Sequence, residues 1–184
     1  MKRLIIHPQD RTTDFLKIIY DGWEDSEIHT EKLTSKEVKQ LFHHSPTTSQ
    51  IMLLGHGSYK GLFYREDDTK PLFDCVMVGH THRHFLQQRH NIIAIFCNAD
   101  QFARTEGLHG LFSGMIISEL SEAKEYGVLT TQEELDRENA RFASRIRQLL
   151  DEGCLLHEIP SRMKEMDDTH SELTDFNYKN IYYL

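Results

Sequence analysis

Two reactive side chains each follow an apolar run of the sequence. His56 comes after residues 51–55, which read Ile-Met-Leu-Leu-Gly, and Cys97 comes after residues 92–96, which read Ile-Ile-Ala-Ile-Phe. Short runs without polar alternation predict strands of a parallel sheet that is covered on both faces. Parallel strands end at one edge, where open α/β folds bind ligands. We therefore expect an imidazole and a thiol to emerge side by side.

A thiol within reach of an imidazole is the arrangement of a cysteine hydrolase. The thiolate is the nucleophile, and a neighbouring imidazole can lower the thiol pKa so that thiolate forms near neutral pH. Each residue alone also has a structural interpretation, because cysteine is often buried in the core and a histidine after a strand can simply form a turn. The joint placement of His56 and Cys97 favours the catalytic interpretation.

Composition predicts one compact domain over residues 1–184. The chain is 39% hydrophobic and 27% charged, which is enough apolar material for a full core. Its formal net charge is −8, from 29 acidic and 21 basic residues. That balance argues against a surface that neutralises phosphates, so we do not expect nucleic acid as a partner.

The sequence also predicts a cytoplasmic protein. The longest apolar runs fall well short of the roughly 20 residues that a membrane-spanning helix needs, and the N-terminal residues do not resemble a secretion signal. Cys75, Cys97 and Cys154 form an odd, sparse set that does not suggest a disulfide framework. A reducing compartment is therefore expected, with no membrane partner and with the oligomeric state left open.

Alternating strands and helices are expected to position the two residues. The clearest element is a helix over 131–150, with Thr131 and Glu134 as a capping box at its start and Gly153 after its end. A second helix begins at Thr34 or Ser35 and stops before Pro46. The other segments are predicted as a strand at 3–6, a helix at 12–19, a short strand at 26–30, a hairpin or loop at 59–71, a mostly helical stretch at 73–88, a loop at 107–114, a helix at 115–126, a short helix or loop at 160–174 and a strand at 178–184.

This order of motifs resembles the caspase-like cysteine peptidases, the group that contains caspases, gingipains, legumains, separases and bacterial CHAT domains. As in that group, a strand ending in His-Gly precedes a strand ending in Cys. The small-residue loop 110–114 and the following helix with Ser118 and Ala123 are similar to the segment behind the cysteine of CHAT domains. The resemblance covers residues 1–127, and 128–184 add a C-terminal helix and a terminal strand. It implies an α/β caspase-like three-layer sandwich with a mostly parallel central sheet flanked by helices.

The resemblance also implies roles for individual residues. His56 would be the general base and the proton donor to the leaving amine, and Cys97 would be the nucleophile that forms a thioester. The backbone amides of Gly57 and Cys97 would bind the oxyanion, and a polypeptide substrate would lie across the carboxyl edge of the sheet without a cofactor. The sequence around Cys97 reads Phe-Cys-Asn-Ala-Asp instead of the Gln-Ala-Cys-Arg-Gly type, so a preference for aspartate is not implied.

Two neighbours are candidates for a substrate pocket, and each has an alternative interpretation. Asp100 could favour a basic substrate side chain or cap the helix that begins behind Cys97. Ser58 could line the same pocket or serve only the turn after His56. A second hypothesis keeps the same fold as a catalytically silent interaction or sensing domain, because a fold can persist without its activity.

A third hypothesis is a metal-dependent phosphoesterase. Residues 76–82 read Val-Met-Val-Gly-His-Thr-His, which resembles the Gly-His-Thr-His element of calcineurin-like metallophosphoesterases. His80 and His82 would point the same way from a strand, and His56 or His84 could add a third imidazole. The early Asp-x-His, the Gly-Asp pair and the Asn-His of that family are missing, so the favoured interpretation includes no metal.

Overall fold

A six-stranded, mostly parallel sheet forms the centre of the molecule. The computed structural model describes residues 2–70 and 72–184. The strand order is β2-β1-β3-β7-β8-β9, in which only the last strand runs antiparallel to its neighbour. The strands are β1 (Arg3–Ile6), β2 (Ser26–His29), β3 (Gln50–Leu54), β7 (Ile92–Ile95), β8 (Gly110–Ser113) and β9 (Ile181–Tyr183). The chain therefore has a mixed α/β fold.

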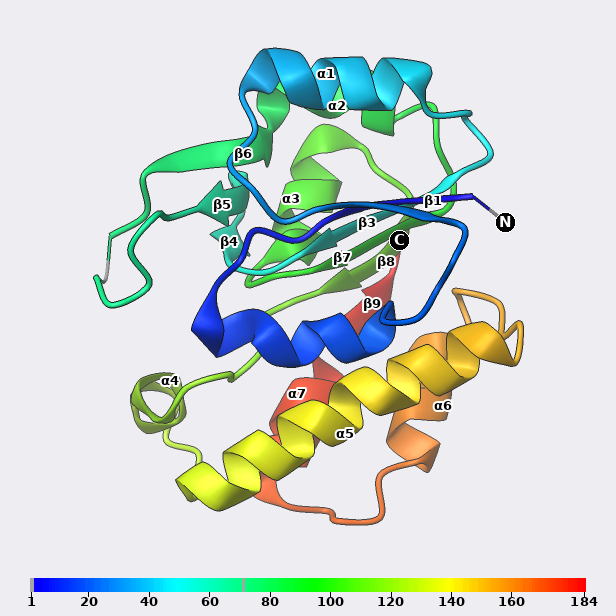
Figure 1. The fold of residues 1–184 in the computed structure, drawn as a ribbon. Coiled ribbons are helices and arrows are strands. Elements are labelled where there is room, and N and C mark those ends of the chain that lie inside the picture. The colour runs from blue at the N-terminus through cyan, green and yellow to red at the C-terminus, as the bar shows by residue number, and fades with distance from the viewer. Residues whose placement is uncertain (1, 71) are drawn as a thin grey trace.

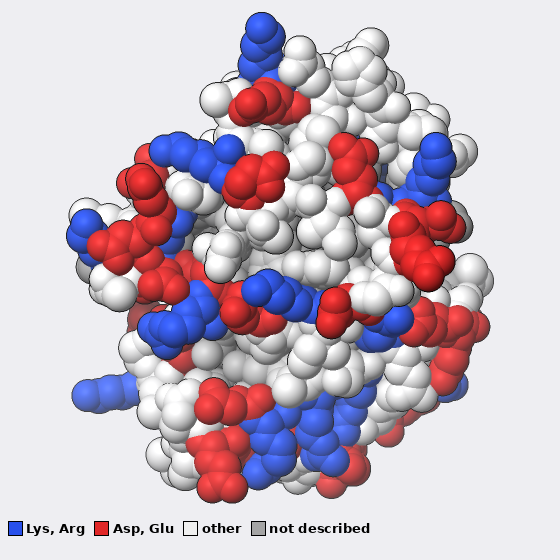
Figure 2. Space-filling view, in the orientation of Figure 1, with Lys and Arg blue, Asp and Glu red and all other residues white. Residues whose placement is uncertain are grey.

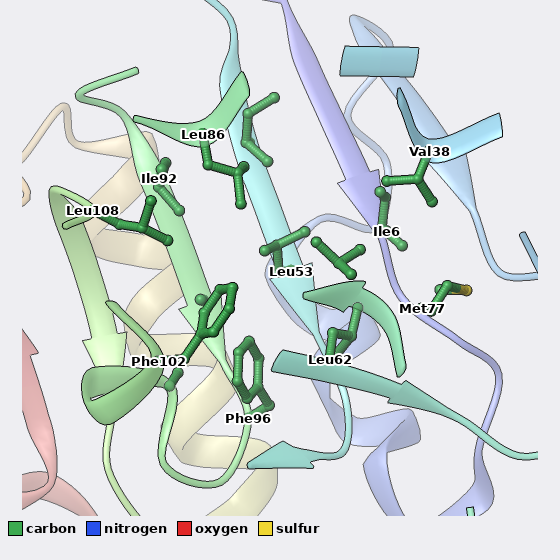
Figure 3. Close-up of a cluster of buried hydrophobic side chains, with 14 of the residues drawn as sticks. Ile6, Val38, Leu53, Leu62, Met77, Leu86, Ile92, Phe96, Phe102 and Leu108 are labelled. Atoms are coloured by element: carbon green, nitrogen blue, oxygen red, sulfur yellow. The ribbon is translucent and has the colours of Figure 1, made fainter. Parts of the chain in front are cut away.

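Helices cover both faces of this sheet and produce three layers (Figure 1). One face packs against α1 (Ser35–His44), α2 (Arg83–Leu86) and α3 (Ala99–Glu106). The other packs against the 3₁₀ helix η1 (Arg11–Ile19), α5 (Gln132–Asp151), α6 (Ile159–Glu165) and α7 (Glu172–Lys179). Because side chains alternate along a strand, Leu53 joins the first cluster while Met52 and Leu54 join the second. Figure 3 shows part of the first cluster, in which Leu53, Leu62 and Phe96 lie close together.

The direction of strand addition reverses between β1 and β3. From β1 the chain adds β2 on one side, and it then adds β3, β7 and β8 on the other side. Such a reversal leaves a crevice between the loops that leave the two strands, and ligands of open α/β sheets bind there. The loops after β1 and β3 carry Asp10 and His56, so these residues meet at the reversal.

A small antiparallel sheet lies at the carboxyl end of β3 (Figure 1). It consists of β4 (Gly57–Ser58), β5 (Gly61–Tyr64) and β6 (Cys75–Gly79). The prediction of a mostly helical stretch at 73–88 was wrong for its first half, which forms β6. Leu62 pairs with Val78 and Phe63 pairs with Val76, with an irregularity of register between the two pairs, so this segment is held as a strand by its pairing with β5. Helical structure begins only at His80, in the short 3₁₀ helix η2 (His80–His82) and then in α2.

Two further segments differ from the prediction. The expected loop at 107–114 contains β8, and the helix expected at 115–126 is limited to α4 (Leu120–Glu125). Gly110 explains the first difference, since a Cβ there would lie 2.1 Å from the carbonyl oxygen of Ile92 on the adjacent strand. A glycine that suggests a loop in the sequence thus permits close approach of two strands. The helix α7 was not predicted, and it includes residues 178 and 179, which were expected to begin the terminal strand; that strand is limited to β9.

The helices α1 and α5 begin at the residues that the sequence predicted. Thr34 and Glu37 form a complete capping box on α1, and the Thr131 side chain accepts a hydrogen bond from the Glu134 amide on α5. The first helix differs, because Asp10 caps η1 in place of Thr12 or Thr13. No helix within the described residues is long and apolar enough to cross a membrane.

Candidate functional site

His56 and Cys97 line the same small cavity. They follow β3 and β7, which are adjacent and parallel with Leu54 paired to Ile95. The first helix contributes Phe15 to the cavity wall, and the segment after β8 contributes Ser118. The cavity holds about 20 Å³, which is space for about one water molecule and not for a peptide. The structure thus brings the two predicted residues together at one small cavity.

The hydrogen-bond network assigns the proton on the His56 ring. The Thr12 hydroxyl donates to Asp10 Oδ1 at 2.7 Å, so its oxygen is free to accept from His56 Nε2 at 2.6 Å. The same nitrogen lies 3.5 Å from Asp10 Oδ1. Nε2 therefore carries a hydrogen, and Nδ1 is the nitrogen that can accept a proton from another group.

Asp10 is the charged centre behind this histidine. The carboxylate is 4% exposed and accepts hydrogen bonds from Arg65 Nε at 2.5 Å and from the Thr12 amide at 3.0 Å. Burial alone would raise the pKa of Asp10, but the hydrogen bonds from His56, Arg65 and Thr12 outweigh burial and hold that pKa well below its usual range. A carboxylate fixed in this way would stabilise a positive charge on the imidazole.

Cys97 differs from the sequence-based expectation in its ionisation. Its thiol donates to the carbonyl oxygen of Ile116 at 3.8 Å. Burial and the nearby negative charge of Glu122 raise the pKa of Cys97 to about 12. The expected lowering of this pKa by His56 is therefore wrong for this conformation, because withdrawal from water disfavours the thiolate more than nearby groups favour it. Cys97 is a neutral thiol here.

The Glu122 carboxyl group is itself partly withdrawn from water. Burial raises the pKa of Glu122, although Glu122 accepts hydrogen bonds from the Ser118 amide at 2.7 Å and the Ser118 hydroxyl at 3.1 Å. It holds the segment that forms the wall of the cavity. Movement of this segment would change both the size of the cavity and the charge beside the thiol.

A sharp turn carries the chain from β7 through Cys97 into α3. Asn98 has φ 62° and ψ 31°, the left-handed region that few residues other than glycine adopt. Its amide donates to the Gly114 carbonyl at 3.0 Å, and the Ala99 amide donates to the Phe96 carbonyl at 3.1 Å. Phe96 packs in the cluster under α3 (Figure 3), and both Phe96 and Cys97 contribute to the lining of the cavity. The turn thus leads the chain out of β7 and directly into α3.

Gly57 is required by packing. A Cβ there would lie 2.4 Å from Phe96 Cδ2 and 2.5 Å from the Gly61 carbonyl oxygen. The His56 carbonyl accepts a hydrogen bond from the Phe63 amide at 2.8 Å. In an antiparallel pair, hydrogen-bonded and non-hydrogen-bonded residue pairs alternate, so the next pair, Gly57 and Leu62, is not hydrogen-bonded and the Gly57 amide points away from β5. The residue thus combines close packing with an amide that faces out of the small sheet.

The two tentative pocket residues lie outside the lining of the His56–Cys97 cavity. The Ser58 hydroxyl accepts the Lys60 amide at 3.1 Å, so it serves the turn between β4 and β5. Asp100 lies in the first turn of α3, with one carboxylate oxygen 4.0 Å from Arg104 Nε. The expectation that Asp100 caps this helix is wrong, because Asn98 occupies the cap position and Asp100 is the second residue of the helix.

An aromatic side chain covers His56 from outside. The Phe73 ring lies 5.3 Å from the His56 ring and 5.1 Å from the Phe63 ring. Arg65 lies over the same phenyl ring at 5.2 Å, and Phe73 is 36% exposed. The loop that leads into β6 therefore closes this side of the site.

The histidines of the Gly-His-Thr-His element do not converge. His80 contacts the Glu106 carboxylate at 2.9 Å, the buried His82 contacts the Ser35 hydroxyl at 3.1 Å, and His84 is exposed. Within residues 2–70 and 72–184, His, Cys, Asp and Glu side chains form no group of three that could hold a metal ion. The described residues therefore provide no metal centre of the kind that the phosphoesterase hypothesis requires.

Sequence reasoning missed the partners of His56. Asp10 and Thr12 follow β1, at the same edge of the sheet as His56, and Arg65 reaches them from the small sheet. The available signal was an acidic residue and a hydroxyl residue just past the end of a strand. It was ambiguous because the same pair also caps η1.

Comparison with known proteins adds no relative. No protein-family model matches the chain, and no curated protein matches its sequence. The functional argument therefore depends on the fold and on the geometry of the site.

Proposed function

We propose that this protein is a caspase-like cysteine endopeptidase in which His56 and Cys97 form the catalytic pair. One observation carries the proposal: the two side chains emerge from the ends of adjacent parallel strands and line one cavity. The mostly parallel sheet between two helical layers agrees with the architecture that the resemblance implies. The free cysteines agree with activity in a reducing cytoplasm.

The protonation pattern of His56 suits general base catalysis. With the Nε2 proton held by Thr12, Nδ1 would take the Cys97 proton as the sulfur attacks the substrate carbonyl. The nearby Asp10 carboxylate would stabilise the imidazolium, which then protonates the leaving amine. Water would hydrolyse the resulting thioester by the reverse proton transfers. The amides of Gly57 and Cys97 would stabilise the oxyanion.

The described conformation is a resting state of this enzyme. A cavity of about 20 Å³ and a thiol with a raised pKa of about 12 allow neither peptide entry nor thiolate formation. Substrate binding would have to displace Phe73 or the segment around Ser118, and it would thereby select an open state.

Labelling by peptide electrophiles tests the proposal. The protein is incubated with a mixture of peptide acyloxymethyl ketones that differ in the residue next to the ketone, and adducts are located by mass spectrometry. We expect modification of Cys97 before Cys75 and Cys154. His56→Ala should slow it by about a hundredfold or more, whereas His84→Ala, which removes an exposed histidine, should leave it unchanged. Labelling of all three cysteines at equal rates, or an unchanged rate in His56→Ala, refutes the catalytic pair.

The closed site favours one second candidate, a catalytically silent interaction domain of the same fold. Its supporting observation is the raised pKa of the Cys97 thiol, because a cysteine that stays a neutral thiol is typically inert. Absence of any peptide adduct on Cys97, in protein that remains folded, would select this candidate.

A further inference from the structure

One wall of the His56–Cys97 cavity is attached to the C-terminal helix α7. This wall includes residues 114–118, which we call the Ile116 segment and which contribute Ile116 and Ser118 to the cavity lining. The carbonyl oxygen of Ile116 accepts the hydrogen bond from the Cys97 thiol at 3.8 Å. A group that fixes the Ile116 segment therefore also fixes the surroundings of the thiol.

Asn177 of α7 binds both backbone groups of the next residue in this segment. Its Oδ1 accepts a hydrogen bond from the Ile117 amide at 2.8 Å, and its Nδ2 donates one to the Ile117 carbonyl oxygen at 3.2 Å. Asn177 is 2% exposed, and Ile117 is fully buried. The side-chain amide thus satisfies a buried N–H and a buried C=O at once, as a neighbouring strand would. We call these two hydrogen bonds the Asn177 clamp.

The clamp acts on the peptide group that contacts the thiol. The Ile116 carbonyl and the Ile117 amide belong to one peptide bond, which is planar and trans, so the two groups point in opposite directions. Asn177 binds this peptide group through the amide, and Cys97 binds it through the carbonyl. Rotation of the peptide plane would break both contacts.

Two further anchors hold the ends of the Ile116 segment. The Gly114 amide donates to the Asn180 carbonyl at 2.8 Å, and the Ser118 amide donates to the Glu122 carboxylate at 2.7 Å. Asn177 holds the segment between these two points, beside the carbonyl group that faces the thiol. The clamp is therefore the anchor that bears most directly on Cys97.

The clamp consists of uncharged groups in the interior. The Asn177 side chain and the Ile117 backbone carry no net charge. On the face shown in Figure 2, acidic and basic side chains are interspersed, so this face gives no reason to expect a strongly charged regulator. Release of the clamp thus depends on movement of the Ile116 segment relative to α7.

We propose that Asn177 is a positioning residue that holds Cys97 in the resting conformation, and that release of the Asn177 clamp opens the site. This inference rests on the proposed peptidase function. While the clamp is intact, the Ile116 segment keeps the thiol withdrawn from water and the cavity at about 20 Å³. Release lets the segment move away from the thiol, so that water and substrate enter. Because α7 lies outside residues 1–127, the C-terminal part of the chain acquires a role in controlling the site.

Alkylation of the cysteines by iodoacetamide tests the clamp without requiring catalysis. The rate at each cysteine is measured by mass spectrometry between pH 7 and 11 in wild type, Asn177→Asp and Asn177→Ala. Asn177→Asp keeps an acceptor for the Ile117 amide but puts an oxygen in place of the donor to the Ile117 carbonyl, with little change in volume. Asn177→Ala removes both hydrogen bonds.

We expect Cys97 to react about tenfold faster or more at pH 8 in both variants. Loss of a buried hydrogen bond that leaves its partner unpaired shifts an equilibrium by about this factor, here toward the open state. Since the thiolate is the reacting form, the rate should also level off at a lower pH than the wild-type pKa of about 12 requires. Unchanged Cys97 rates in both variants would overturn the proposal.

Tyr178→Phe is the matched control on the same helix. It removes the hydrogen bond that the Tyr178 hydroxyl accepts from Arg145 on α5 and leaves the Asn177 clamp intact. Cys97 should react in this variant within about twofold of the wild-type rate. An equal acceleration in Tyr178→Phe would show that any weakening of α7 has the same effect, and it would overturn the positioning role of Asn177.

Cys75 and Cys154 report global unfolding in every variant, because an unfolded chain exposes all three thiols. Their rates should stay unchanged while that of Cys97 rises. A parallel rise at all three cysteines would mean that the Asn177 variants only lose stability, which would also overturn the proposal.

The peptide acyloxymethyl ketones separate this inference from the proposed function. Their labelling of Cys97 should accelerate in Asn177→Asp, because a larger fraction of the molecules is open. Faster reaction with iodoacetamide but no peptide adduct in any variant would support the clamp and refute the peptidase. Peptide adducts together with unchanged iodoacetamide rates would support the peptidase and overturn the clamp. Slower peptide labelling despite faster reaction with iodoacetamide would overturn the opening of the site to substrate.

Discussion

Replacement of Asp10 by asparagine tests whether this carboxylate is the charged centre of the site. The side chain is 4% exposed and binds Arg65 through two hydrogen bonds, at 2.5 and 3.0 Å. Asparagine has nearly the same shape, but it removes the charge and turns an NH₂ group toward one of these donors. The guanidinium of Arg65, with a side chain only 8% exposed, then remains buried without its counter-ion.

The expected loss of stability is large. Removal of one partner from a buried ion pair typically costs about 3–5 kcal/mol, because the other charge stays withdrawn from water. We expect Asp10→Asn to lower the free energy of unfolding at pH 7 by about 3 kcal/mol. The matched control is Asp14→Asn on the same helix, where the pair with Lys17 is about half exposed and worth less than about 1 kcal/mol.

The pH dependence of this loss has a defined sign. The pKa of Asp10 is lower in the folded protein than in the unfolded chain, so its stabilisation is fully present above the unfolded value of about 4 and is lost as pH falls toward the folded pKa. Urea unfolding followed by circular dichroism at pH 3 to 7 measures this. The difference between wild type and Asp10→Asn should be constant from pH 7 to 5 and smaller at pH 3. A loss below about 1 kcal/mol at pH 7, or one that is unchanged at pH 3, would refute the reasoning.

Three other changes have expected outcomes. Burial lowers the pKa of His7 to about 4. The free energy of unfolding of the wild type should therefore fall by roughly 3 kcal/mol between pH 6.5 and 4, because only the unfolded chain takes up a proton in this range. His7→Asn should remove this pH dependence of stability in urea titrations, and a variant that keeps it would contradict the prediction. Thr131→Ala should cost about 1 kcal/mol through loss of the α5 cap while Thr131→Ser costs little, measured by thermal unfolding; equal losses would exclude the cap. Gly57→Ala should destabilise the fold by about 1–3 kcal/mol because its Cβ would overlap Phe96, whereas Ser58→Ala should cost less than half as much.

The reactive strand ends were predictable because they depend on local pattern. A continuous apolar run identifies a strand buried on both faces, and the residue behind it must lie at the carboxyl edge. His56 and Cys97 could thus be placed at the same edge of a sheet, whereas their closeness also required β3 and β7 to be adjacent strands. The helix caps at Thr34 and Thr131 were predictable for the same reason, because each side chain accepts a hydrogen bond from an amide only three residues further along the chain.

Where the predicted secondary structure was wrong, the conformation depends on strands that are distant in the sequence. Residues 75–79 form a strand because β5 pairs with them, and Gly110 belongs to a strand because β7 passes close to its backbone. In both segments the local signal was weak, and tertiary contacts decided the outcome. The same reason applies to Asp10, whose cap role is local but whose contact with His56 spans 46 positions from 10 to 56.

By itself, the sequence determined the α/β pattern and the placement of an imidazole and a thiol at the ends of two buried strands, and the adjacency of those strands in the sheet brought the two groups together. Only the tertiary structure decided the state of that thiol, the orientation of His56 by Thr12 and Asp10, and the contact of Asn177 with Ile117. The periodicity of a sequence reports which side chains are buried. Their pKa values and hydrogen-bond partners depend on the groups that packing places around them, and these come from distant parts of the chain.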